Sequence, residues 1–341
     1  MAEALLGLGE GERREALLVA ADRTGRPAYL LEKDVWVVWT LSVLFESALG
    51  EHLVFKGGTS LSKAYGGLIQ RFSEDIDLTH DIRQLIPDMA EAGDVEPIPA
   101  SGAQAKKWTN AVRQRLPTWI SDEVVPVLDA AIKKYDLDLT LIQEGEKLRL
   151  QYAQLTKGNN YVRPEILLEF GARSTGEPAS TKKVVCDAAP VLPELVFPEA
   201  MPRVMAAERT FWEKATAAHV SCLKGEFRGD RYARHWHDIA RLAEAGIVKA
   251  AIADRDLANR VADHKQAFFA EKAPDGSVID YVRAISGELM LVPVGDALEA
   301  LRSDYQEMIS SGLFEEDPCS FEVLMHQCRA IEAEANRQVM S

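Results

Sequence analysis

The sequence lacks a long uninterrupted apolar stretch and has few cysteines. Its most apolar stretch, DVWVVWTLSVLFESALG, is broken by Asp34 and Glu46, and it falls short of the roughly 18 apolar residues that predict a membrane span. The cysteines are far apart and form no CxxC pair, so we expect reduced thiols rather than a disulfide frame or a zinc knuckle. They are Cys186, Cys222, Cys319 and Cys328. The first 18 residues have no signal-peptide layout, and we therefore expect a cytoplasmic protein without a membrane partner.

The composition is that of a folded soluble protein. The chain has 341 residues, of which 47% are hydrophobic and 27% are charged, enough for one large domain or two ordinary ones. A net charge of −14 argues against a surface that coats nucleic acid over its whole area. Residues 203–241 nevertheless hold eight basic residues against five acidic ones, whereas residues 295–341 hold three against ten. Any nucleic-acid cleft is therefore expected to be local.

Hydrophobic periodicity divides the chain near residue 200. Helical spacing covers 10–21, 30–49 and 104–135, and strand patterns cover 52–55, 75–80, 137–143, 147–154, 163–170 and, more weakly, 182–186. After the proline-rich stretch APVLPELVFPEAMP only helical patterns follow, at 206–223, 232–245, 256–272, 296–310 and 319–338. We predict an α+β fold with a mixed sheet in residues 1–200 and an all-helical half in residues 201–341 that completes the active-site cleft.

The stretch FKGGTSLSKAYGGLIQRFSEDIDLTH, from Phe55 to His80, combines glycines, hydroxyls and alternating carboxylates. Gly57 and Gly58 let the backbone approach a ligand closely, and a helix that begins at Thr59 or Ser60 would offer free N–H groups to an anion. The hydroxyls of Ser60 and Ser73 would add phosphate contacts. This part of the stretch therefore predicts a phosphate-binding turn.

Two aspartates follow the turn. In a strand, side chains two residues apart share a face, so Asp75 and Asp77 are expected to project together. Two carboxylates on one face repel each other unless solvent or a cation lies between them, and Mg²⁺ favours one or two carboxylates together with substrate phosphates. A solvated strand edge is the alternative interpretation of the aspartate pair on its own.

A third carboxylate is expected from a neighbouring strand. In RPEILLEF the side chains of Glu165 and Glu169 share one face. Glu169 is the first candidate for a metal ligand and Glu165 the second, the alternative for both being an exposed strand acid. Arg173, just beyond the strand, would contact phosphate or RNA, or lie free on the surface.

The order of strand, glycine–hydroxyl turn, helix and DxD strand is the core of the nucleotidyltransferase-β type fold. The stretch also resembles the first motif of the AbiEii/AbiGii family of nucleotidyltransferase toxins. Further segments that resemble the family are LLEKDVWVVWTLSVLF, AERTFWEKATAAHV, RYARHWHDIARL and RSDYQEMISSGLFEEDPCSFEVLMHQCRAIEAEAN. Together they extend from Leu30 to Asn336.

The resemblance implies a toxin of a type IV-like toxin–antitoxin or abortive-infection pair with a cognate antitoxin. Related MenT-type toxins transfer nucleotides to the acceptor end of tRNA and so stop translation. Ser73, Asp75 and Asp77 match residues of the family's first motif. Lys214 matches the lysine in the segment AERTFWEKATAAHV, and Asp238 matches the aspartate in the segment RYARHWHDIARL. One departure is His237, where the family more often has tyrosine.

The later motifs suggest electrostatic roles. Lys214 would place a positive charge over the β- and γ-phosphates and stabilise the departing pyrophosphate; a surface lysine is the alternative. Asp238 would orient Lys214 or approach the nucleotide or metal, or it would form a helix pair with Arg234. Arg234 and His235 would contact phosphate or acceptor RNA, and Arg228 and Arg231 would extend that surface.

These observations lead to one hypothesis and two alternatives. The hypothesis is a nucleotidyltransferase that uses Mg²⁺ or Mn²⁺ to move a nucleotidyl group from an NTP to the 3′ hydroxyl of tRNA. The phosphates would bind at Gly57, Gly58, Thr59 and Ser60 and at Lys214. The first alternative transfers the nucleotidyl group to a protein or small molecule, and the second is a binding module without catalysis.

Overall fold

The computed structural model describes residues 3–90, 93, 95–158, 162–226, 232–310, 312 and 314–337. The chain forms two compact units. The sheet unit comprises Met1–Tyr65, Ser73–Ala92 and Asn110–Val204, and the helical unit comprises Gly66–Phe72, Gly93–Thr109 and Met205–Ser341. The helical unit therefore takes in two short segments from the first half of the sequence.

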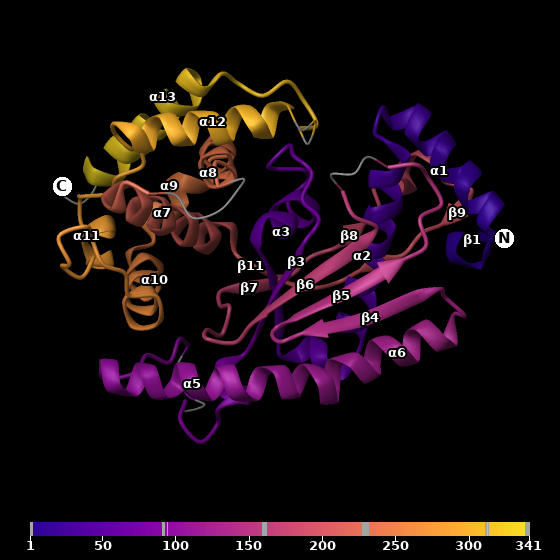
Figure 1. Ribbon diagram of the computed structural model, residues 1–341, viewed down its shortest axis with the longest axis horizontal. Coiled ribbons are helices and arrows are strands. Elements are labelled where there is room, and N and C mark those ends of the chain that lie inside the picture. Colours follow the sequence, from indigo (N-terminus) through magenta and orange to yellow (C-terminus); the bar gives the residue numbers. More distant parts are fainter. Residues whose placement is uncertain are drawn as a thin grey trace. The chain divides into compact units, whose positions relative to one another are not determined.

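Among the described residues of the chain, seven strands form one mixed sheet in the order β4-β5-β6-β3-β2-β11-β7. Strand β3 runs antiparallel to β2 and parallel to β6, so the middle of the sheet mixes both directions. Strands β4, β5 and β6 lie side by side in Figure 1. The bounds are β2 Leu53–Lys56, β3 Ile76–His80, β4 Leu139–Glu144, β5 Lys147–Tyr152, β6 Glu165–Gly171, β7 Ala179–Thr181 and β11 Arg203–Met205. The predicted strands β2 to β6 are confirmed within two residues at every end, while β7 and β11 were not predicted.

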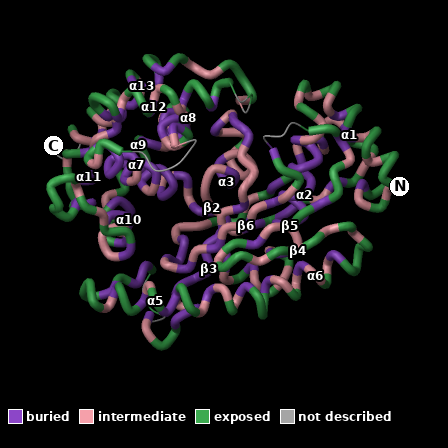
Figure 2. The backbone as a smooth tube through the Cα atoms, in the orientation of Figure 1, coloured by how far each residue is buried: buried purple, intermediate pink, exposed green. Residues whose placement is uncertain are grey.

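Two helices precede the sheet, as predicted. They are α1 (Glu10–Thr24) and α2 (Ala28–Glu46). The break between them is explained by Gly25, whose φ of 72° lies in the left-handed region, and by Pro27 at the N-cap of α2. Helix α2 is buried along most of its length, whereas α1 is largely exposed, in green in Figure 2. Because the stretch from Val35 to Leu44 is apolar apart from Thr40 and Ser42 and is mostly buried, α2 belongs to the core of the sheet unit.

The segment predicted as a long helix over 104–135 is helical throughout but changes its winding once. It consists of α5 (Gly102–Trp119), a π-helical turn (Ile120–Val124) and α6 (Val125–Lys134). The turn lies between Pro117 and Pro126, each of which lacks the N–H that a regular helix uses. Helix α6 contacts β4 and α2.

After β11 the regular elements among the described residues are helices, apart from isolated bridges. The helices are α7 Ala207–Lys224, α8 Arg234–Glu244, α9 Ile247–Ala253, α10 Arg255–Phe268, α11 Tyr281–Ile285, α12 Asp296–Ser310 and α13 Phe321–Arg337. Helix α7 contacts α8, α9 and α10, and α8 also contacts α13. The predicted α+β class, a mixed sheet followed by helices, is thereby confirmed; the short helices α9 and α11 were not predicted.

The remaining elements are short. Helix α3 (Gly57–Ala64) joins β2 to the segment before β3 and contacts both strands. The others are β1 Glu3–Ala4, β8 Val184–Val185, β9 Leu195–Val196, β10 Glu199–Ala200 and α4 Ile82–Leu85, with 3-10 turns at Leu5–Gly7, Ala48–Glu51 and Ala189–Val191.

Candidate functional site

Asp77 lies in the middle of the sheet, and Asp75 directly precedes its strand. Strand β3 begins at Ile76, so Asp77 is a strand residue and Asp75 belongs to the connection before it. Both side chains are half-buried. The prediction that Asp75 starts the strand is therefore one residue too early, and strand geometry alone does not determine how the two carboxylates are oriented.

Gly57 lies against the carboxylate of Asp77. It follows β2 with a φ of +78°, in the left-handed region, and a Cβ atom built on it would fall 2.1 Å from Oδ2 of Asp77. Only glycine leaves room for this approach. The structure thus brings the predicted glycine turn and one of the two predicted metal-binding carboxylates into direct contact.

Helix α3 begins one turn earlier than the sequence suggested. Its N-cap is Lys56 and its first residue is Gly57, so the prediction of Thr59 or Ser60 at the N-cap is wrong. Gly57 has a left-handed φ at this first position, a conformation that glycine adopts without steric cost. The first N–H groups of the helix have no acceptor within the helix, and this end of α3 is therefore suited to an anion.

The hydroxyl groups near the glycine turn form hydrogen bonds within the protein. Ser60 Oγ donates to the carbonyl oxygen of Gly57 at 2.9 Å. Thr59 Oγ1 donates to the carbonyl oxygen of Asp75 at 2.6 Å and lies 2.9 Å from Oγ of Ser73. Because these bonds link α3 to the segment before β3, they keep the glycine turn close to Asp75.

Asp77 belongs to a row of charged residues across the sheet. It is paired with Lys56 on β2 and with Glu169 on β6, and Glu169 is paired in turn with Lys147 on β5. Side chains in such cross-strand pairs share a face, and like charges placed opposite each other are destabilising. The adjacent Asp77 and Glu169 therefore favour a cation nearby.

Basic side chains of β5 offset part of this negative charge. Glu169 forms an ion pair with Lys147, and Glu165 forms one with Arg149 at 2.5 Å. Within the described ranges, no three or more His, Cys, Asp or Glu side chains gather as a complete metal site. Asp75 and Asp77 nevertheless fit Mg²⁺, which commonly uses one or two carboxylates and completes its shell with water and substrate phosphates.

In the helical unit, Lys214 and Asp238 meet a third residue that the sequence analysis missed. Lys214 Nζ on α7 lies 2.9 Å from Oδ2 of Asp238 on α8. Arg71 donates from Nε to Oδ1 at 2.8 Å and from Nη2 to Oδ2 of the same carboxylate at 2.7 Å. Such a two-point guanidinium–carboxylate pair fixes both position and orientation.

The three charges are deeply buried, and burial alters their pKa values. Asp238 is fully buried; burial alone would raise the pKa of its carboxyl, but Arg71 and Lys214 hold that pKa well below its usual range. Burial lowers the pKa of Lys214, which Asp238 raises and Arg71 lowers, and the net result is a lowered pKa. Among the described residues, Asp238 thus forms ion pairs with Arg71 and Lys214 rather than with Arg234, and its predicted role of orienting Lys214 in the reaction stays a prediction.

Arg234 and His235 are the first two residues of helix α8, beside this cluster. Arg234 is exposed and His235 is half-buried. Burial, followed by the charges of Lys214 and Arg234, lowers the pKa of His235 well below its usual value. Three basic side chains, those of Arg71, Lys214 and Arg234, thus act on the neutral imidazole of His235 or on the carboxylate of Asp238. The positive charge exceeds the negative charge, and this excess is suited to an anion. Arg228 and Arg231 lie outside the described residues.

Arg173 follows β6 in the sheet unit and is half-buried. Burial lowers the pKa of its guanidinium, Glu146 raises it and Arg113 lowers it. Its predicted contact with phosphate or RNA stays a prediction.

The tryptophans of the later motifs pack in the core. Trp212 and Trp236 are almost fully buried. The indole N–H of Trp212 donates to the carbonyl oxygen of Ala251 at 2.9 Å, and that of Trp236 donates to Leu291 at 2.5 Å. Their burial makes them packing residues rather than base-stacking platforms.

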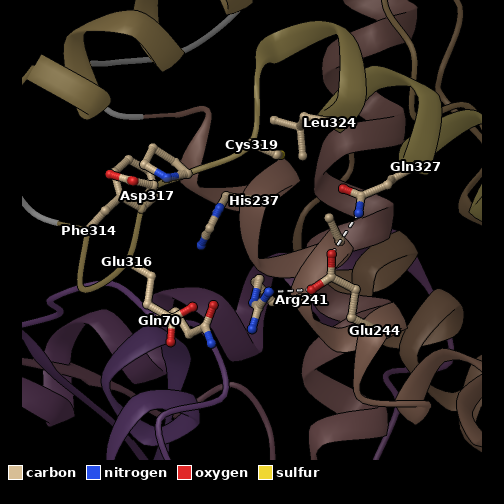
Figure 3. Close-up of a pocket in the computed structure, with 12 residues that line it drawn as sticks. Gln70, His237, Arg241, Glu244, Phe314, Glu316, Asp317, Cys319, Leu324 and Gln327 are labelled. Atoms are coloured by element: carbon tan, nitrogen blue, oxygen red, sulfur yellow. Dashed lines mark hydrogen bonds and ion pairs between the residues drawn. The ribbon is translucent and has the colours of Figure 1, made fainter.

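A cavity of about 200 Å³ lies beside α8 in the helical unit. Figure 3 shows His237, Arg241 and Glu244 of α8 on one side, with Glu244 joined to Arg241 and to Gln327 of α13. His237, at the position where tyrosine is usual, uses Nε2 to bond the carbonyl oxygen of Ile69 at 2.7 Å. Its ring is also in edge contact with Phe314, so this departure from the family pattern is accommodated by packing.

Among the residues that the structure describes, no helix combines the length and apolar character needed to span a bilayer.

Solved structures of other proteins are similar to the chain over most of its length. A solved structure of MenT4, the nucleotidyltransferase toxin Rv2826c of Mycobacterium tuberculosis H37Rv, is similar at 18% identity, with 96% of this chain and 99% of that chain covered and a TM-score of 0.40. The structure of JHP933 from Helicobacter pylori is similar at 16% identity, with 91% of each chain covered and a TM-score of 0.38. No curated protein matches significantly.

The family comparison covers most of the chain. The model for "Nucleotidyl transferase AbiEii toxin, Type IV TA system" matches residues 39–328. That range contains the glycine turn, both aspartates, Lys214 and Asp238. The chain therefore belongs to the AbiEii family of nucleotidyltransferase toxins of type IV toxin–antitoxin systems.

Proposed function

We propose that this toxin moves a nucleotidyl group from an NTP to a 3′ hydroxyl of RNA, with tRNA as the acceptor, and so blocks translation in the cytoplasm. The observation that carries the proposal is the contact between Gly57 and Asp77, since a Cβ at Gly57 would fall 2.1 Å from the carboxylate. A turn suited to a triphosphate and a carboxylate suited to a divalent cation are thereby adjacent.

The triphosphate binds at the start of α3. Backbone N–H groups of Gly57, Gly58 and Thr59 donate to phosphate oxygens, because the first turn of a helix has no acceptors of its own for them. The hydroxyls of Ser60 and Ser73 lie at the same end of the helix and complete the cradle. Asp75 and Asp77 would hold Mg²⁺ or Mn²⁺, with Glu169 opposite Asp77 as the third carboxylate.

When bound, the divalent ion would neutralise charge on the phosphates and polarise the α-phosphate. Asp75 or Asp77, directly or through a water, takes the proton of the acceptor hydroxyl as its oxygen attacks the α-phosphorus. A new phosphodiester bond forms, the bond between the α-phosphorus and the bridging oxygen breaks, and pyrophosphate leaves with the electron pair.

Lys214 stabilises the departing pyrophosphate. Asp238 and Arg71 support this role because they hold the ammonium group in one orientation, with Nζ 2.9 Å from the carboxylate. A preoriented cation stabilises developing charge without reorganisation during the reaction. Arg173, Arg234 and His235 would contact phosphate or the acceptor RNA.

Family membership implies a cognate antitoxin as partner. The tRNA acceptor rests on the resemblance to MenT-type toxins described above. Binding of such a polyanion to a local basic surface would weaken steeply as salt concentration rises. Transfer that is insensitive to salt would contradict this part of the proposal.

The experiment that tests the proposal is incubation of the protein with each α-labelled NTP, Mg²⁺ and total tRNA, beside the Asp75→Ala variant. We expect label in tRNA with the unchanged protein and none with the variant. Label in a protein or small molecule would show that this molecule, rather than RNA, is the acceptor. Absence of label from every fraction would refute catalysis. Growth arrest on expression, relieved by the same substitution, tests toxicity independently.

A further inference from the structure

Three consecutive charged residues of α2 are buried in the sheet unit. Glu32, Lys33 and Asp34 are only 2%, 3% and 5% exposed. Successive residues of a helix point about 100° apart, so the three side chains extend to three different parts of the unit. The family motif in this helix has no role in the reaction proposed above, and its burial requires another explanation.

Asp34 holds helix α3. Its Oδ1 lies 2.5 Å from Nζ of Lys63, which is on α3, and its Oδ2 accepts a bond of 2.7 Å from the backbone N–H of Asp187. Lys63 also donates to Oδ1 of Asp187 at 2.6 Å. Because α3 begins at Gly57 and spans only Gly57–Ala64, this cluster anchors the helix that carries the phosphate turn.

Lys33 holds the segment before β3. Its Nζ lies 2.7 Å from Oε2 of Glu74 and donates to the carbonyl oxygen of Arg163 at 3.0 Å. Glu74 is directly followed by Asp75. Lys33 therefore ties the chain beside the first catalytic carboxylate to the same helix that holds α3.

Glu32 is engaged elsewhere. Its carboxylate accepts bonds from the backbone N–H of Leu155 at 2.8 Å and of Thr156 at 3.1 Å, and from Oγ1 of Thr156 at 2.7 Å. Leu155 and Thr156 follow β5, so the printed bonds of Glu32 fix a different segment from those held by Lys33 and Asp34. Glu32 can therefore serve as a control. It is a charged residue of the same helix with similar burial, and it bonds to a segment that has no part in the proposed reaction.

Buried ion pairs are inefficient stabilisers, because the loss of hydration offsets most of the attraction between the charges, and apolar side chains of similar volume often serve stability as well. What the pairs do provide is fixed geometry. We propose that Lys33 and Asp34 are positioning residues that set the separation between the triphosphate turn at Gly57 and the carboxylate at Asp75. This inference rests on the nucleotidyl transfer proposed above.

The test compares Lys33→Met, Asp34→Asn and Glu32→Gln in the full chain. We expect kcat for transfer of α-labelled NTP to tRNA to fall about 10- to 100-fold in the first two variants, as for other residues that orient a ligand. The Mg²⁺ concentration for half-maximal rate should rise in Lys33→Met, since Asp75 is displaced. Glu32→Gln should lower the thermal midpoint as much as the others while kcat stays close to that of the unchanged protein.

Two further measurements separate positioning from general destabilisation. Conservative Lys33→Arg should restore much of kcat, and amide hydrogen exchange should rise in 73–77 for Lys33→Met and in 57–64 for Asp34→Asn, but in neither segment for Glu32→Gln. A parallel loss of kcat in all three variants that follows their thermal midpoints would overturn the inference. Absence of transfer by the unchanged protein would instead refute the proposed function itself.

Discussion

The α-carbon of Gly57 faces the carboxylate of Asp77 so closely that a single added carbon would fall 2.1 Å from Oδ2. Gly57 begins helix α3 and Asp77 lies in β3, in register with the preceding residue, Lys56. The residue that starts the phosphate turn and the carboxylate that would bind a cation thus restrict each other sterically. Several expected properties of the protein depend on this contact.

Substitution of Gly57 by alanine should abolish most activity. The left-handed φ alone costs a non-glycine residue about 1–2 kcal/mol, and the added Cβ must also displace Asp77 or the turn. A displacement of about 1 Å at a reacting centre can lower a rate about 100-fold. We expect a loss of at least about that size in kcat for label transfer to tRNA.

The matched control for Gly57→Ala is Gly145→Ala. Gly145 has a similar φ of +63° in the same unit, but a Cβ there would meet no atom within 4 Å. This variant should lose stability through backbone strain and keep its kcat. Equal kcat values for the two variants would show that the Gly57–Asp77 contact has no part in catalysis.

The carboxylates should differ in importance. Loss of an outer-shell partner of a metal typically costs about 10- to 100-fold, so Asp77→Asn, which removes a proposed ligand, should lower kcat about 100-fold or more. Glu169→Gln should cost less, because Lys147 already pairs with that carboxylate. Rates measured over a range of Mg²⁺ concentrations check both expectations; a larger loss in Glu169→Gln would reverse the proposed order of the ligands.

The pH dependence of the reaction should report Lys214. Burial lowers the pKa of this amine below its usual value of about 10.4, even though Asp238 favours the charged form. The protonated form is the active one, so its contribution is complete at pH values below the lowered pKa and is lost as the pH rises through it. In Lys214→Arg the cation does not titrate in this range, and the ratio of unchanged to variant kcat should fall as the pH rises.

That ratio removes effects of pH on the acceptor and the metal, which both proteins share. A constant ratio between neutral pH and pH 10 would mean that Lys214 does not titrate there or does not act as a cation in the reaction.

Arg71 should be essential for the stability of the helical unit. Its two bonds to Asp238 are buried, with both side chains almost inaccessible. Removing one partner of a buried ion pair commonly costs about 3–5 kcal/mol. Arg71→Met should therefore lower the midpoint of urea unfolding strongly, whereas Arg302→Met, which breaks an exposed ion pair with Glu322, should change it little.

An unchanged unfolding midpoint in Arg71→Met would contradict this account of the cluster. Loss of kcat without loss of stability would instead show that Arg71 acts on the substrate.

Local patterns predicted much of the sheet unit. The alternation in RPEILLEF predicted that Glu165 and Glu169 share a face, and β6 indeed alternates between buried and half-buried residues. The order of strand, turn, helix and strand across residues 53–80 was also evident, because each step depends on neighbours within a few residues. The start of α3 was misplaced because the left-handed φ of Gly57 is a property of the folded turn.

Contacts between distant residues could not be derived from one sequence. Arg71 and Asp238 are 167 positions apart, and no periodicity relates them, although Arg71 stands two residues before Ser73 in the first motif. The pairing of Asp77 with Glu169 likewise depends on the register of β3 against β6. Short elements such as β11 and α9 have too few residues to establish a period.

The most direct test of nucleotidyl transfer is a parallel reaction with α-labelled and γ-labelled NTP, Mg²⁺ and tRNA, for the unchanged protein and Asp77→Asn. The account predicts that α-label enters tRNA, that γ-label is released only as pyrophosphate, and that Asp77→Asn does neither. Entry of γ-label into tRNA, or equal transfer of α-label by Asp77→Asn, would contradict it.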